Sequence, residues 1–223
     1  MARFVKILRL LIPLCLIPLT VLLGATVADE RHYGFVSLSV AILVIWLFLL
    51  GFEKGTPSSR RTVLVAVLIA LSVVGRMIPL FKSITAITVL AAIYLGAESG
   101  FAVGALSALI SNFYFGQGPW TPFQMLAWGM IGLVAAWLSV PLKKSRVLLL
   151  IYGLLSALLY SALMDVWTVL WASASITPSL YLAALATALP HTLLYAVSNV
   201  IFLAFLAKPF GEKLERVKIK YGV

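Results

Sequence analysis

Long apolar runs separated by short polar breaks recur along this 223-residue chain. A helix needs about 20 predominantly apolar residues to cross the hydrocarbon core of a bilayer. Polar breaks at Asp29–His32 and Glu53–Arg61 divide the first part of the chain into two predicted spans, Val5–Ala28 and Phe35–Phe52. The pattern therefore predicts an all-α, polytopic membrane protein.

The apolar pattern continues after the second break. The stretch from Ile84 to Phe115 is too long for one ordinary span and short for two, and Gly96–Gly100 interrupts it. We expect two short helices there, Ile84–Leu95 and Phe101–Tyr114, joined by a tight turn. The remaining predicted spans are Thr62–Phe81, Phe123–Leu142, Val147–Trp171 and Leu180–Ala207, with a basic, amphipathic tail from Lys208. The prediction is thus eight helices.

Composition agrees with a membrane environment. Hydrophobic residues make up 63% of the chain and charged residues only 11%, whereas a soluble domain has about 25% charged residues. The formal net charge of +10 therefore does not indicate a nucleic-acid-binding face on a folded soluble domain. In a membrane protein such an excess collects in cytoplasmic loops.

The distribution of basic residues tests the helix count. With the N-terminus inside and eight spans, 14 of the 17 basic residues lie on the inner side. If the stretch from Ile84 to Phe115 were one helix, eight of them would move outside. Charge asymmetry therefore favours the two-helix interpretation and cytoplasmic N- and C-termini. The inner residues are Arg3, Lys6, Arg9, Lys54, Arg60, Arg61, Lys143, Lys144, Arg146, Lys208, Lys213, Arg216, Lys218 and Lys220.

The predicted domain organisation is a two-helix extension, residues 1–60, followed by a six-helix core, residues 61–223. The basic start and apolar centre of the first 28 residues are also typical of a signal peptide. Because the apolar stretch Leu10–Ala28 is long enough to span, we expect a retained helix, with cleavage as the alternative.

Candidate ligand-binding residues lie at the predicted outer helix ends. Arg76 and Asp165 are ionisable residues within predicted spans, where such groups are costly and mark functional or pairing sites. They could form a structural ion pair or the polar floor of a pocket. Aromatic and amide residues accompany them, and amides need hydrogen-bond partners that an interfacial aromatic belt does not supply. We therefore predict an outward-open small-molecule site that contains Arg76, Asn112, Tyr114, Gln117, Trp120, Gln124, Trp128, Asp165, Trp167 and Trp171.

Small residues predict close helix approach at two places. Ala66 and Ala70 share one helix face at i, i+4, and so do Gly100 and Gly104. Motifs of common enzymes are missing: there is no HExxH, GxSxG or GxxxxGK, so no catalytic or metal-binding residue is predicted. Two alternatives stay open, a membrane-embedded enzyme using Asp165 and His191, and a ligand-free assembly protein.

Thr62–Lys220 resembles the substrate-binding S components of energy-coupling factor (ECF) vitamin transporters. The resemblance rests on three segments in the same order. Ala66–Ala70 matches the family's AxxxA motif, Ile87–Gly104 its paired short helices, and Ser111–Met125 (SNFYFGQGPWTPFQM) the loop that enters its fourth helix. The last segment looks closest to S components for cobalamin.

The resemblance implies a six-helix core in a prokaryotic cell membrane that captures a vitamin at its outer face. It also implies three partners: a transmembrane T component, contacting the face that bears Ala66 and Ala70, and two ATPases that use ATP. No cofactor is expected in this chain. The extra helices Val5–Phe52 depart from the family pattern, and they must leave the Ala66/Ala70 face uncovered.

Overall fold

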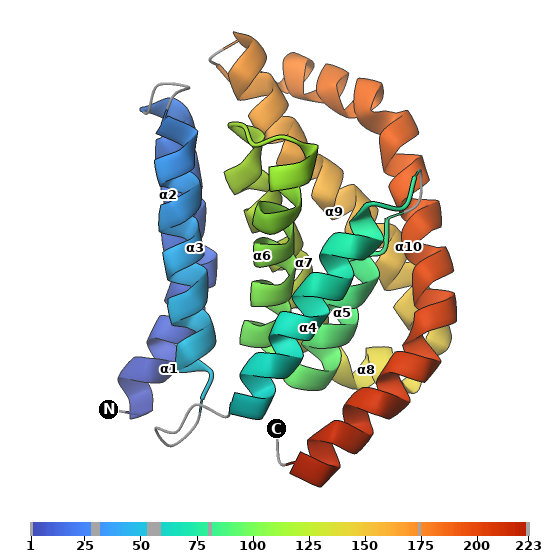
Figure 1. Ribbon diagram of the computed structural model, residues 1–223. Coiled ribbons are helices and arrows are strands. Elements are labelled where there is room, and N and C mark those ends of the chain that lie inside the picture. The colour runs from blue at the N-terminus through green and yellow to red at the C-terminus, as the bar shows by residue number, and fades with distance from the viewer. Residues whose placement is uncertain (1, 28–31, 53–58, 80–81, 174, 222–223) are drawn as a thin grey trace.

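The computed structural model describes residues 2–27, 32–52, 59–79, 82–173 and 175–221, and these residues form helices and short turns without a strand. Asp29–Arg31 and Glu53–Ser58, in the two predicted breaks, lie outside the described residues, as does Phe81. The helices run in chain order (Figure 1): α1 (Ala2–Leu11), η1 (Ile12–Leu16), α2 (Ile17–Thr26), α3 (Tyr33–Leu50), α4 (Ser59–Arg76), α5 (Ile84–Leu95), α6 (Ala97–Phe115), α7 (Trp120–Trp137), α8 (Ser139–Lys144), α9 (Arg146–Ser173) and α10 (Pro178–Tyr221).

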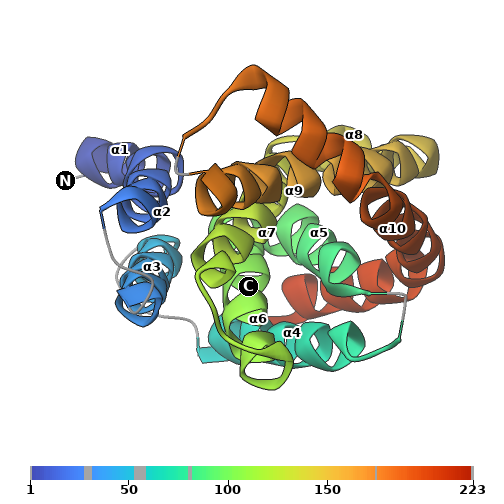
Figure 2. The ribbon, with the colours of Figure 1, turned by 90° about the horizontal axis from the view of Figure 1, so that it is seen from above.

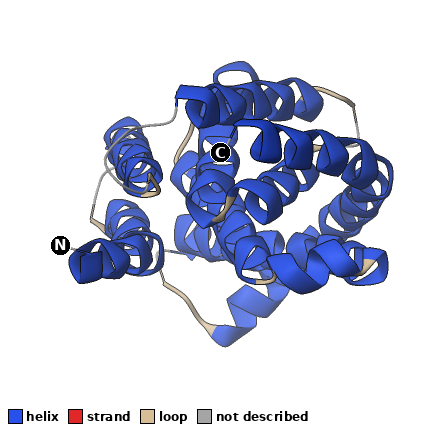
Figure 3. Ribbon diagram, turned by 90° about the horizontal axis from the view of Figure 1, so that it is seen from below, coloured by secondary structure: helices blue, strands red, loops and turns tan. Residues whose placement is uncertain are grey.

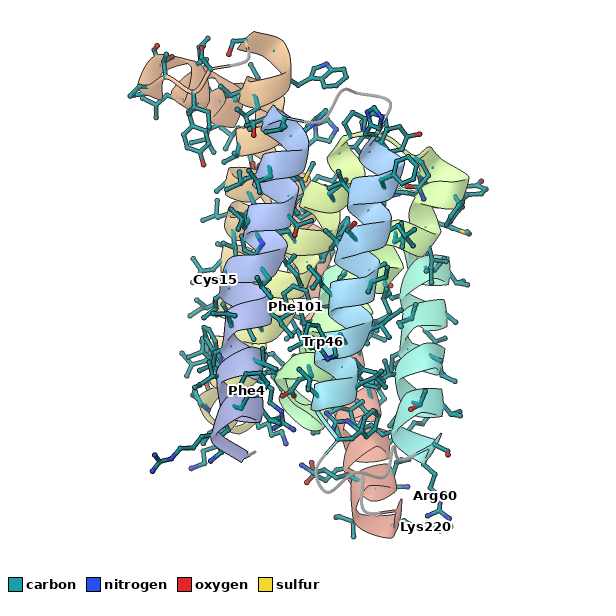
Figure 4. The ribbon with its side chains drawn as sticks, turned by 90° about the vertical axis from the view of Figure 1, so that its left-hand side faces the viewer. Phe4, Cys15, Trp46, Arg60, Phe101 and Lys220 are labelled. Carbon is teal, nitrogen blue, oxygen red and sulfur yellow. The ribbon has the colours of Figure 1, made fainter. Side chains whose placement is uncertain are left out.

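The N-terminal helices form a hairpin beside the remaining bundle (Figure 2). α1 and α2 continue into one another through η1, a π-helical turn with Pro13 near its start. Because proline has no N–H, a local π-helical adjustment lets the helix continue past it. α3 then returns alongside, and the hairpin packs through α2 and α3 against α6 and α7. Figure 4 shows Cys15 about midway along this hairpin, and its side chain is exposed.

The predicted break in the long apolar stretch is a helical hairpin. α5 ends at Leu95, as predicted, but α6 begins at Ala97 instead of Phe101, so Gly96 alone reverses the chain. Its φ of 95° lies in the region that favours glycine. The two-helix interpretation is confirmed, and its turn is tighter than expected because one positive-φ residue suffices.

Glycines hold the centre of the bundle together. A Cβ added to Gly100 would overlap Ala92 of α5, and one added to Gly104 would overlap the main chain of α7 at Trp128. Gly132 of α7 lies equally close to the main chain at Gly100. The predicted close approach at Gly100 and Gly104 is therefore confirmed, and it fixes α6 between α5 and α7.

Three further helix boundaries differ from the predictions by several residues. α4 ends at Arg76, before the predicted limit at residue 81, and α7 ends at Trp137, followed by the separate short helix α8. The predicted last span and the basic tail form one continuous helix, α10, with Pro190 and Pro209 inside it. Hydropathy marks where a chain leaves an apolar environment, whereas a helix can continue into a polar one, so the two boundaries need not coincide.

α1 begins and α10 ends at the same end of the bundle (Figure 1), which we call the inner end; Figure 3 views the bundle from this side. Arg60 and Lys220 lie there (Figure 4). Four stretches of the described residues are long and apolar enough to cross a membrane: Arg3–Thr26, Tyr33–Leu50, Arg146–Ser173 and Pro178–Lys220. The fold is that of an all-α polytopic membrane protein.

Candidate ligand-binding site

A buried arginine organises the outer end of the bundle. Arg76, the last residue of α4, donates hydrogen bonds to Asn112 Oδ1 (2.8 Å), Gln124 Oε1 (3.3 Å) and Ser111 Oγ. Only 7% of Arg76 is exposed. The three acceptors lie on α6 and α7, so Arg76 joins three helices that surround the Gly104 crossing. We call Arg76, Ser111, Asn112 and Gln124 the arginine cluster.

A second layer of hydrogen bonds orients the amides of this cluster. Asn112 Nδ2 donates to Gln124 Oε1 and to Thr121 Oγ1, both at 2.9 Å. The Thr121 hydroxyl donates to Gln117 Oε1 (3.0 Å), and Gln117 Nε2 donates to the Leu109 carbonyl (2.9 Å). The three amides predicted from the sequence thus form one network at the α6–α7 turn. These hydrogen bonds orient the three amide groups relative to one another.

Aromatic rings cover the guanidinium of Arg76. Its Cζ atom lies 4.9 Å from the centroid of the Trp128 ring and 5.0 Å from that of Phe115. The Trp128 ring in turn packs against Tyr160 of α9 (4.6 Å), which packs against Tyr195 of α10 (5.4 Å). Sequence reasoning missed Phe115, Tyr160 and Tyr195. The spacing Tyr160–Trp167, at i, i+7 on one helix face, was an available signal.

Among the described residues, Arg76 has no acidic partner. No salt bridge joins it to Asp165, so the structural ion pair, one of the two alternatives for these residues, is not formed, and no other described carboxylate pairs with Arg76. Its position at the C-terminus of α4 and the two ring faces stabilise the charge in part. A buried guanidinium whose hydrogen-bond acceptors are neutral oxygens can donate hydrogen bonds to a ligand without first breaking an ion pair.

Asp165 instead lies in a neighbouring cavity of about 360 Å³ between α9 and α10. Asp165 Oδ2 accepts a hydrogen bond from Ser161 Oγ (3.1 Å), which accepts one from Thr192 Oγ1 (2.8 Å). The two helices also touch nearer the inner end, where Gly153 admits Leu203. Tyr160, Tyr195, Trp167, Asp165 and His191 are among the cavity's lining residues.

Three of the four predicted tryptophans, Trp120, Trp167 and Trp171, form a row. The ring of Trp167 lies 5.9 Å from that of Trp120 and 6.0 Å from that of Trp171. A second cavity of about 190 Å³ separates Trp167 and Trp171 from α2 and α3. Tyr114, also predicted for the site, does not join it: its side chain is 70% exposed and packs only on the neighbouring Phe115 ring among aromatic partners.

The residues of the two alternative hypotheses are also placed. His191 is exposed at the cavity, and no hydrogen bond joins it to Asp165. Within the described ranges, no group of three His, Cys, Asp or Glu side chains could hold a metal ion. Ala66 and Ala70 are exposed on α4, and the N-terminal hairpin leaves them uncovered.

A multi-helix membrane bundle with a buried, charged and aromatic cluster at one end defines a ligand-binding membrane protein. The family comparison is more specific, since the model of the ECF-type riboflavin transporter S component matches residues 56–216. Because this match covers more than half of the chain, the chain belongs to the ECF-type riboflavin transporter S component family. No curated protein and no solved structure matches the chain.

Proposed function

We propose that this chain is the substrate-capture subunit of an ECF-type importer and that its ligand is a flavin, bound between the arginine cluster and the cavity of α9 and α10. The proposal adds a ligand, partners and an orientation to the family assignment. In it, the outer end faces outside and the inner end, with its basic residues, faces the cytoplasm of a prokaryotic cell.

One observation carries the ligand proposal: Arg76 is buried against ring faces and has no carboxylate partner among the described residues. A flavin is planar and aromatic, which suits packing on Trp128 and Tyr160. Its ring carbonyls are neutral acceptors that suit a hydrogen-bond donor such as Arg76, and its hydroxylated chain suits Asp165 and Ser161. The riboflavin description of the matching family supports the same ligand class.

Cobalamin, the ligand suggested by the loop at Ser111–Met125, is the less supported candidate. The cavity of about 360 Å³ is near the lower limit of pockets for drug-sized ligands. A corrinoid is far larger than a tricyclic ring and would require α9 and α10 to move apart. The size of the cavity therefore favours the flavin.

Titration of the purified protein with riboflavin tests this proposal, because stacking against tryptophan or tyrosine quenches flavin fluorescence. We expect saturable quenching without ATP. Arg76→Gln should weaken binding about 10- to 150-fold, the equivalent of losing a hydrogen bond from a charged group. Arg3→Gln, an exposed arginine at the opposite end, is the matched control and should bind normally.

The outcomes separate the ligand from the function. Saturable binding of cobalamin without binding of riboflavin would reject the flavin and keep the capture function. Unchanged riboflavin affinity in a folded Arg76→Gln protein would show that the ligand lies elsewhere. If a broad vitamin screen produced no thermal stabilisation, the ligand-free assembly hypothesis would replace the proposal, because a ligand of the folded state must stabilise it.

The partner proposal rests on the exposed face of α4. Ala66 and Ala70 lie uncovered on it, and small side chains allow another helix to approach closely. We infer that a T component, acting with two ATPases, docks there. Replacing both alanines with tryptophan should abolish assembly and uptake in cells that express the partners, while riboflavin binding by the isolated protein stays unchanged.

Ala183 and Ala186 supply the matched control for that experiment. Both are exposed on α10, one turn apart, away from α4. The double tryptophan variant at these positions should retain assembly and uptake. Uptake that survives in the Ala66/Ala70 variant would place the partner on another face of the core.

A further inference from the structure

A third cavity, of about 270 Å³, lies toward the inner end among α5, α8, α9 and α10. Its walls are aliphatic and include Leu90 of α5 and Leu149 of α9. Its polar lining consists of Tyr94 and three cations, Lys143, Arg146 and Lys208. It is separate from the cluster of Arg76, which lies at the other end of the bundle.

The protein compensates these three cations only in part. Lys143 Nζ lies 3.7 Å from Glu215 Oε2 and 4.4 Å from the centroid of the Tyr94 ring. Arg146 Nη2 donates one hydrogen bond to the Ala204 carbonyl (2.9 Å), which leaves its other N–H groups available. Lys208 has no hydrogen bond or ion pair with any described residue.

We propose that this cavity binds an anionic phospholipid, with the phosphate between Lys143, Arg146 and Lys208 and the start of an acyl chain against Leu90 and Leu149. Charge complementarity and the apolar walls together support this ligand. A free phosphate would leave the aliphatic walls against water, and a zwitterionic lipid would bring its own cation next to three others. Basic pockets between helices at the cytoplasmic membrane surface bind such head groups.

The position in the fold supports the same ligand. α8 is a short helix with Lys143 and Lys144 in its last turn, and it leads directly into α9. It lies at the inner end of the bundle (Figure 1). Lipid head groups meet the protein at this level of a membrane, so a lipid could enter sideways without crossing the bundle.

Lipid adducts counted by native mass spectrometry test the proposal. The protein is released from nanodiscs that contain phosphatidylglycerol or phosphatidylcholine, and inorganic phosphate is a third condition. We expect retained phosphatidylglycerol in preference to the other two. The triple variant Lys143→Gln/Arg146→Gln/Lys208→Gln should weaken retention roughly 100-fold. Each basic residue near the membrane surface contributes about a fivefold factor, and the three factors multiply.

Two further variants keep the test decisive. Arg3→Gln/Lys213→Gln/Lys218→Gln removes the same charge from exposed positions outside the cavity and should retain the lipid. Ala207→Phe narrows the cavity but keeps all three cations, and it should also lose the lipid. This variant decides the test if the triple variant fails to fold. Equal loss in the control, equal retention of phosphatidylcholine, equal binding of inorganic phosphate, or full retention by Ala207→Phe would each overturn the proposal.

Discussion

The two ends of α4 each carry an arginine, and their partners differ in kind. At the inner end, Arg61 Nη2 donates to the Leu95 carbonyl (2.8 Å) and Nη1 to the Gly51 carbonyl (3.1 Å). Leu95 is the last residue of α5, and Gly51 is the C-terminal cap of α3. Arg61 also donates to Ser99 Oγ and lies over the Phe52 ring. At the outer end, by contrast, Arg76 donates to side-chain oxygens and to no main-chain carbonyl of the described residues, and it faces two aromatic rings.

The difference separates a structural arginine from one available to a ligand. Helix ends leave main-chain carbonyls without intrahelical partners, and a cation there satisfies them and the helix dipole. Arg61 therefore fills a requirement of the fold itself. The acceptors around Arg76 are side-chain oxygens, so a ligand oxygen that replaced one of them would leave the main-chain carbonyls of the helix ends with their partners.

Arg61→Leu should have the largest effect on stability. It leaves the Leu95 and Gly51 carbonyls and the Ser99 hydroxyl without their charged donor. We expect the free energy of unfolding to fall by about 3 kcal/mol, measured as a lower melting temperature in detergent. Riboflavin affinity of the folded fraction should not change, because the site lies at the other end of the bundle.

Arg3→Leu is the control for that measurement, since Arg3 is exposed on the first turn of α1. It should leave the melting temperature unchanged. If Arg61→Leu lowered riboflavin affinity as strongly as Arg76→Gln does, the two ends would be coupled and their proposed separation would be wrong.

Gly104→Val should have an intermediate effect on stability and should change both properties. Its side chain would overlap the Trp128 carbonyl and the Gly129 nitrogen, which are main-chain atoms that cannot rotate away. Overpacking of this kind costs about 1–3 kcal/mol. Because Trp128 also covers Arg76, riboflavin affinity should fall together with the melting temperature.

Gly34→Ala is its matched control, because a Cβ there meets nothing within 4 Å. Stability and riboflavin affinity should both remain close to those of the unmodified protein. A Gly104→Val protein that melts normally would contradict the tight α6–α7 crossing on which the position of Trp128 depends.

Much of the fold followed from the sequence because lipid imposes strong rules. Hydropathy and the asymmetry of basic residues predicted the hairpin at Gly96. The length of the apolar stretch alone did not decide between one helix and two. The end of α4 at Arg76 was not predicted. Hydropathy does not detect a helix end that neighbouring side chains bury, so the predicted span continued to residue 81.

The candidate site was predictable by residue type and less so by pairing. Asn112, Gln117 and Gln124 were singled out because amides need partners, and the structure joins them in one network. The sequence left open whether Arg76 and Asp165 form an ion pair, because depth along a helix says nothing about rotation around it. In the structure no salt bridge joins the two residues.

The smallest predicted effect concerns Lys82, in the turn between α4 and α5 beside Arg76. Partial burial, and then the charge of Arg76, hold the pKa of Lys82 below its ordinary value of 10.5. The unfolded chain then binds more protons over the range between the lowered pKa and 10.5, so stability should rise with pH across that range.

Comparison of the unmodified protein with Lys82→Met from pH 8 to 11 isolates this contribution, because all other groups titrate alike in both. The difference in melting temperature should grow in favour of the unmodified protein as pH rises. Arg76→Gln should reduce the slope without abolishing it, since burial is the larger cause. Lys213→Met, at an exposed position on α10, should leave the slope intact. A difference that shrinks with rising pH would mean that folding raises the pKa of Lys82 instead of lowering it.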